Sequence, residues 1–113
     1  MLRPERAAEL FAAELSENHV RMDVSEKTKA QAAAAWFNEL HEYGVAHLPV
    51  GAGAEISEAF ARKAVKACSN KMRNDPDGTE QKYGLPILLI LGFLPTLFTF
   101  ISWIVNWFRG NDE

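Results

Sequence analysis

The stretch "ELHEYGVAH", residues 39–47, gathers the side chains of this chain that are best suited to bind a metal ion or move a proton. It contains Glu39, His41, Glu42 and His47. A helical metal site needs its ligands on one face, for example two histidines at i and i+4 with a glutamate between them. The two histidines here are six residues apart, and no third strong ligand follows at a fixed offset. We therefore predict ordinary histidines near a helix end and no metal site.

Cys68 is the only cysteine, which excludes a disulfide or a multi-cysteine metal site within one chain. Lys66 and Lys71 are close to it in sequence and could lower the pKa of its thiol. A nucleophilic cysteine also needs a positioned base and an oxyanion site, and the sequence shows neither. The pattern favours a small hydrophobic residue on the flank of a helix.

The glycine-rich stretch "GAGAE", residues 51–55, is the remaining candidate for chemistry. A dinucleotide-binding loop needs a third glycine three residues after the second, and Ile56 stands there. No Lys-Ser or Lys-Thr pair follows it, as a phosphate-binding loop would require. We interpret the stretch as a flexible connection. The sequence thus predicts no catalytic residue and no cofactor, and indicates that the protein is not an enzyme.

Three helices carry these residues, so the predicted fold class is all-α. Apolar residues recur at helical spacing over about 4–18, 26–43 and 54–72. Ser25 is a suitable N-cap for the second helix, and Gly44 is suited to end it. We predict a small three-helix head over residues 1–74.

The core of this head is thin. Alanine fills most of the inward positions, and the large candidates are few: Leu10, Phe11, Leu15, Trp36, Phe37, Leu40, Ile56 and Phe60. Because small domains bury little surface, such a head is only marginally stable alone. We expect it to be stabilised by contact with a partner, with a second copy or with a membrane surface.

The C-terminal third has a different composition from the head. Residues 85–108 are 24 consecutive positions without Asp, Glu, Lys, Arg or His. A helix of that length measures roughly 36 Å, and the hydrocarbon core of a bilayer is roughly 30 Å thick. We therefore predict one transmembrane helix over 85–108, preceded by a polar linker over 75–84 and followed by a short tail over 109–113. This is the layout of a tail-anchored protein.

The polar residues of the predicted span fall on one side of the helix. Pro95 near its middle predicts a kink. The stripe consists of Gly92, Thr96, Thr99, Trp103 and Asn106, and the opposite side consists of Ile90, Leu94, Leu97 and Ile101. Small and weakly polar residues on one face are typical of contacts between membrane helices. The alternative is that the hydroxyls bond their own backbone and the span is a passive anchor.

Basic residues near the span predict its orientation. The head side is richer in lysine and arginine than the C-terminal side, which has only Arg109. The positive-inside tendency places the head in the cytoplasm and the C-terminus across the membrane. We expect these basic side chains to contact anionic lipid headgroups. They are Arg62, Lys63, Lys66, Lys71, Arg73, Lys82 and Arg109.

These features favour a non-enzymatic, single-pass membrane protein whose head binds a protein partner, as an accessory subunit or adaptor of a membrane complex. The expected partners are the lipid bilayer and either a membrane protein or a second copy. The net charge of −3 argues against nucleic-acid binding. The alternative is a phage or viral membrane protein, either a virion membrane component or a lysis-type pore former. A membrane-tethered enzyme is disfavoured because no site is visible.

Overall fold

The structure is a computed structural model, and it describes residues 4–17, 24–47, 58–93, 101, 104 and 105. Its helices are α1 (Pro4–Glu17), α2 (Glu26–His47), α3 (Glu58–Asn74), α4 (Pro76–Tyr83) and α5 (Ile87–Gly92). Within these residues all the regular structure is helical. The predicted all-α class is thus confirmed for the part of the chain that the structure describes.

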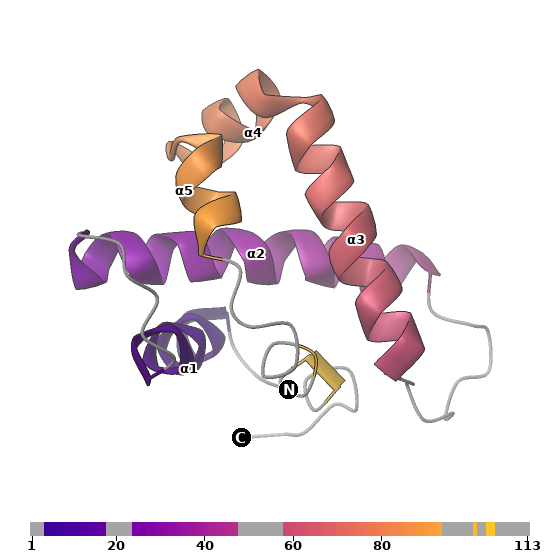
Figure 1. The fold of residues 1–113 in the computed structure, drawn as a ribbon, viewed down its shortest axis with the longest axis horizontal. Coiled ribbons are helices and arrows are strands. Elements are labelled where there is room, and N and C mark those ends of the chain that lie inside the picture. Colours follow the sequence, from indigo (N-terminus) through magenta and orange to yellow (C-terminus); the bar gives the residue numbers. More distant parts are fainter. Residues whose placement is uncertain (1–3, 18–23, 48–57, 94–100, 102–103, 106–113) are drawn as a thin grey trace.

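Helix α2 is the centre of the arrangement. It contacts α1, α3 and α5. Figure 1 shows α1 on one side of α2 and α4 on the other, with α3 crossing α2 and α5 descending from α4 onto the middle of α2. The segment that follows α4 therefore returns to the helix at the centre of the head.

The start of α2 follows the local sequence, and its end does not. Ser25 caps the helix, with its hydroxyl oxygen accepting from the Thr28 backbone N–H at 3.2 Å. The predicted end at Gly44 is wrong, because α2 continues to His47. Gly44 is buried inside the helix. A glycine costs only about 1 kcal/mol in a helix interior, so tertiary packing readily outweighs its preference for an end.

Residues 76–83, which the composition indicates are part of a turn-rich linker, form α4. Asp75 is its N-cap and accepts from the backbone N–H of Gly78 at 3.1 Å. Pro76 follows at the first helical position, where a missing N–H costs nothing. Gly84 ends the helix in the left-handed conformation, with φ of 67°. These are ordinary helix start and stop signals, placed around a polar stretch.

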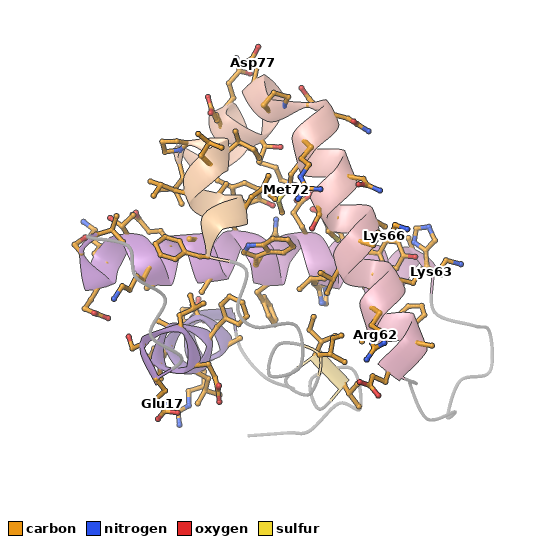
Figure 2. The ribbon with its side chains drawn as sticks, in the orientation of Figure 1. Glu17, Arg62, Lys63, Lys66, Met72 and Asp77 are labelled. Atoms are coloured by element: carbon orange, nitrogen blue, oxygen red, sulfur yellow. The ribbon has the colours of Figure 1, made fainter. Side chains whose placement is uncertain are left out.

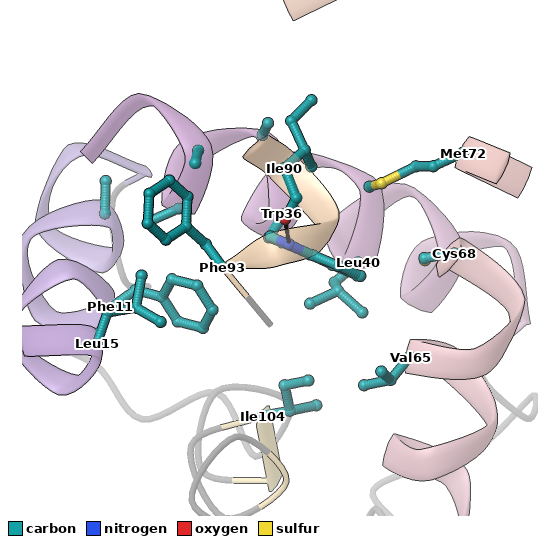
Figure 3. Packing of buried hydrophobic residues seen from close by; sticks show 14 of the residues in the cluster. Phe11, Leu15, Trp36, Leu40, Val65, Cys68, Met72, Ile90, Phe93 and Ile104 are labelled. Carbon is teal, nitrogen blue, oxygen red and sulfur yellow. Dashed lines mark hydrogen bonds between the residues drawn. The ribbon is translucent and has the colours of Figure 1, made fainter. Parts of the chain in front are cut away.

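The hydrophobic core joins the head to the apolar C-terminal segment. Trp36 and Leu40 of α2 are fully buried, and Met72 of α3 packs in the same cluster. The C-terminal segment adds five buried side chains to it, which are Leu85, Ile90, Phe93, Ile101 and Ile104. Figure 3 shows Ile90 beside Trp36, and Phe93 near Phe11 and Leu15 of α1. The C-terminal segment thus supplies the bulk that the alanine-rich head lacks.

Within residues 85–93, which are the first part of the predicted span, the chain forms one short helix. Helix α5 covers six residues, with Pro86 as its N-cap and Phe93 as its C-cap. Pro95 has no N–H for the carbonyl of Leu91, which favours an end at this point. Among the residues that the structure describes, no helix has both the length and the apolar character needed to cross a bilayer. The predicted kink at Pro95 lies outside these residues.

Candidate functional site

The most unusual polar group of the described residues is the Glu39 carboxylate. Its side chain is 4% exposed and lies in the middle of α2. The Lys82 ammonium donates to Oε2 at 2.8 Å, and the Lys71 ammonium lies 3.1 Å from Oε1. The Tyr83 hydroxyl also donates to Oε2. A nearly buried carboxylate is thereby surrounded by three donors.

Three helices bring these groups together: the middle of α2 carries the glutamates, and the last turns of α3 and α4 carry the donors. Glu42 lies one turn after Glu39 on α2 and accepts from Lys82 at 3.3 Å. The last turn of α3 supplies Lys71, and the last turn of α4 supplies Lys82 and Tyr83. We call these five residues the Glu39 cluster. It fastens both α3 and α4 to the central helix.

The environment of the cluster shifts several pKa values in ways that reinforce the contact. Burial acts to raise the pKa of Glu39, but hydrogen bonds from Lys82, Tyr83 and Lys71 outweigh it and leave that pKa below its usual range. Burial and the hydrogen bond to Glu39 raise the pKa of Tyr83 to about 12. The hydrogen bond to Glu39 also raises the pKa of Lys82. The Glu39 carboxylate and the Lys82 ammonium are therefore charged, and the Tyr83 phenol is neutral, at neutral pH.

This arrangement suits a clamp better than a catalyst. A carboxylate with a lowered pKa that already accepts several hydrogen bonds is a poor general base at neutral pH. Burial raises the pKa of the neighbouring Cys68 thiol to about 12, so it is not a thiolate nucleophile. The thiol donates instead to the Glu39 backbone carbonyl at 3.5 Å. The predicted packing role of Cys68 agrees with these contacts.

A cavity of about 220 Å³ opens beside the Glu39 cluster. Its lining includes Glu42, His47, Cys68 and Lys71. Within the described residues, no group of three or more His, Cys, Asp or Glu side chains is arranged to hold a metal ion. His47 instead stacks on Tyr43 with ring centroids 4.1 Å apart, and its Nδ1 lies 3.0 Å from the Tyr43 carbonyl oxygen.

A second set of contacts holds the chain after the cluster. We call residues 84–93 the docked segment. The indole N–H of Trp36 donates to the backbone carbonyl of Ile90 in the buried core. At the other end of α5, the backbone N–H of Ile87 donates to the Glu80 carboxylate at 3.0 Å. The Gly84 backbone N–H also donates to the Glu80 backbone carbonyl at 2.8 Å, so the docked segment is hydrogen-bonded to both α2 and α4.

The docked segment covers the head with one face only. Ile90 and Phe93 have no exposed surface, while Leu88 is 78% exposed. Gly92, a member of the predicted stripe, is exposed as well. Ile101, predicted on the opposite side, is buried. Within the docked segment, the side that carries Ile90, opposite Gly92 of the predicted stripe, is therefore the one that packs on the head. The other stripe residues, which are Thr96, Thr99, Trp103 and Asn106, lie outside the described residues.

The basic residues predicted to contact headgroups fall into two groups. Lys63, Lys66 and Arg73 are exposed on α3, as is Arg62, which pairs with Glu58 at 3.2 Å. Figure 2 shows Arg62, Lys63 and Lys66 along this helix. Lys71 and Lys82 are partly exposed but engaged in the Glu39 cluster. Arg109 lies outside the described residues.

Sequence reasoning considered Glu39 only beside its neighbours in the chain and did not predict its contacts with Lys71, Lys82 and Tyr83. One signal was available, because Glu39 lies between Trp36 and Leu40 on a mostly apolar stretch of α2. A carboxylate in such a place needs partners that offset its loss of solvation. Which lysines provide them depends on how α3 and α4 pack, which no local pattern encodes.

No protein-family model matches the chain, and the searches of curated proteins and of solved structures find no match for it either.

Proposed function

We propose that the protein is a non-enzymatic, membrane-associated adaptor or accessory subunit. Its apolar segment 85–108 anchors it, and its helical head binds a protein partner. One observation carries this proposal. The docked segment belongs to a run of 24 residues without charge, yet its outer face is uncovered, with Leu88 78% exposed.

The energetics of apolar burial favour a lipid environment for this segment. Fully burying a leucine or isoleucine side chain is worth about 1.5–3 kcal/mol. Leu88 gains little of that on the head, and Ile87, Leu89 and Leu91 are only half-buried. A bilayer would bury all four side chains. A helix over 85–108 would also satisfy most of its own backbone groups, as a membrane requires.

The exposed basic side chains of α3 support a location at a membrane surface. A lysine near an anionic leaflet contributes about 1 kcal/mol to binding. Lys63 and Lys66 are exposed. The proposed orientation keeps this head in the cytoplasm and places the C-terminus on the far side, as the distribution of basic residues favours.

The proposed adaptor role follows from the chemistry that the head offers. The groups best placed for catalysis serve as a clamp, since Glu39 is saturated with donors and the Cys68 thiol has a raised pKa. What remains is a set of helices with charged outer faces. A protein partner, or a second copy of the chain, is the binding class that such a surface supports.

Co-flotation with lipid vesicles tests the anchoring. The full chain should float with vesicles and resist extraction by alkaline carbonate. Replacing both Lys63 and Lys66 by glutamine should weaken binding to anionic vesicles by roughly fivefold per charge. Lys27→Gln removes the same charge from an exposed position on α2 and should have a much smaller effect.

A protein that stays in solution with both neutral and anionic vesicles would contradict the proposal. Release of an entrapped dye on binding would indicate the alternative pore former instead of an adaptor. The partner itself is tested by purifying the full chain from native membranes and identifying the proteins that remain bound through a second affinity step.

A further inference from the structure

Two states are available to the docked segment, and they differ in the hydrogen bonding of the α5 backbone. A helix leaves its last four carbonyl groups without partners inside the helix. Because α5 ends at Gly92, the Ile90 carbonyl is one of these. Trp36 satisfies it with its indole N–H, although the two residues are 54 positions apart in the chain.

A continuous helix through 85–108 would use the same carbonyl differently. The carbonyl of residue 90 would then accept from the backbone N–H of residue 94. The Trp36 bond would become unnecessary, and the helix would have to leave the surface of α2 to enter a bilayer. The Ile87 N–H does not distinguish the two states. It belongs to the first turn of the helix and lacks an intrahelical partner both in the docked α5 and in a continuous helix.

The contacts on either side of Gly84 place the hinge between the two states. The Glu39 cluster ends at Tyr83, which is bonded to Glu39 on α2. Gly84 follows with φ of 67°, a conformation that glycine adopts without strain. Its position is open, since a Cβ placed there would have no neighbour within 4 Å. The chain can therefore change direction at Gly84 while α4 stays clamped to the head.

The difference between the two faces of the docked segment favours its transfer from the head into a bilayer. The inner face, with Ile90 and Phe93, is fully covered by the head. The outer face, with Leu88, is not. In water the docked position covers only the inner face of the segment, whereas a bilayer would cover both faces. Resting on the proposed membrane function, we infer that residues 84–93 close an apolar groove over Trp36 in the membrane-free protein, and that their transfer into a bilayer opens this groove.

Tryptophan fluorescence of the full chain tests this inference. Trp103→Phe and Trp107→Phe together leave Trp36 as the only tryptophan. Without vesicles its emission should be that of a buried indole, with little quenching by acrylamide. With vesicles of phosphatidylcholine and phosphatidylglycerol, emission and quenching should change in proportion to the fraction of protein that floats. Flotation with unchanged Trp36 emission and quenching would overturn the inference and leave the proposed function intact.

A second variant tests the competition directly. Trp36→Phe keeps an aromatic ring and removes the N–H donor, so the closed state loses one hydrogen bond. Vesicle binding should then increase about fivefold, the effect of one net hydrogen bond. Ser25→Ala is the matched control, because it weakens the capped end of α2 without touching the docked segment.

If Ser25→Ala raises vesicle binding as much as Trp36→Phe does, general loosening of the head explains the effect and the inference fails. If Trp36→Phe leaves binding unchanged, the bond does not oppose membrane entry, and the inference fails as well. If no form of the protein floats, the proposed function fails first and the inference with it.

Discussion

At the scale of single residues, Glu39 can stabilise the fold only because its partners offset the cost of burying its charge. An isolated charge in the core would be costly, but here Lys71 and Lys82 remain 64% and 42% exposed while bonding to it. The lysines therefore keep part of their hydration, which lowers the cost of the pair compared with a fully buried one. Only the carboxylate bears a large loss of solvation, and three donors offset that loss.

Replacing Glu39 by glutamine should lower the free energy of unfolding by about 1.5–3 kcal/mol, the value of hydrogen bonds to a charged group. The two lysines can turn to solvent in this variant, so the larger cost of a stranded buried charge does not arise. Urea unfolding followed by circular dichroism would measure the difference. An unchanged midpoint would show that the cluster contributes nothing net to stability.

The difference in unfolding free energy between the wild type and Glu39→Gln should depend on pH in a defined direction. The pKa of Glu39 is lower in the folded protein than in the unfolded chain, so its contribution is full above an unfolded pKa of roughly 4.3. That contribution is lost as pH falls through the folded pKa. The stability gap between the wild type and Glu39→Gln should therefore be constant near neutral pH and close in acid. A gap that widens in acid would contradict the lowered pKa.

At the scale of elements, α4 depends on its ends, because its polar sequence buries no residue. Asp75→Ala removes the N-cap that bonds Gly78, which should cost about 1 kcal/mol. Hydrogen exchange over 76–83 should become faster, since local opening needs less free energy. Asp75→Asn is the control, because it removes the charge and keeps a capping oxygen. Equal exchange rates in Asp75→Ala and wild type would show that the cap is dispensable.

The elements also show which structural features a sequence can predict here. The helices of the head follow from periodic apolar residues, and the start of α2 follows from Ser25. The signals for α4 were equally present, in Asp75, Pro76 and Gly84, but the absence of an apolar face made a linker the simpler interpretation. Local patterns also could not assign Lys71 and Lys82 to Glu39, because that pairing depends on the packing of three helices.

At the scale of the whole molecule, the C-terminal segment is where one sequence pattern fits two structures. An uncharged apolar run can be a buried core segment or a membrane helix, and periodicity alone does not separate them. The described residues show Ile90, Phe93, Ile101 and Ile104 in the core of the head. The proposed membrane state uses the same residues in lipid. The same residues can serve both structures because the alanine-rich head lacks enough large side chains to complete its own core.

The head should therefore not be independent of this segment. Ending the chain at Gly84 removes five buried side chains, each worth about 1.5–3 kcal/mol. Their sum is comparable to the whole stability of a small domain, about 5–15 kcal/mol. We expect the truncated chain to lose cooperative thermal unfolding, or to self-associate through the surface around Trp36. Circular dichroism melting and sedimentation velocity would detect the two outcomes.

Leu88→Ser in the full chain provides the matched comparison, because that side chain is 78% exposed and lies outside the core. Its stability should change by no more than about 0.5 kcal/mol, as is usual for a surface position. Its binding to vesicles should fall, since the outer face of the docked segment loses an apolar group. If the truncated head stays monomeric and melts as sharply as the full chain, the C-terminal segment does not contribute to the stability of the head. Residues 84–93 would then not be needed to cover Trp36, which would contradict the inferred closed state.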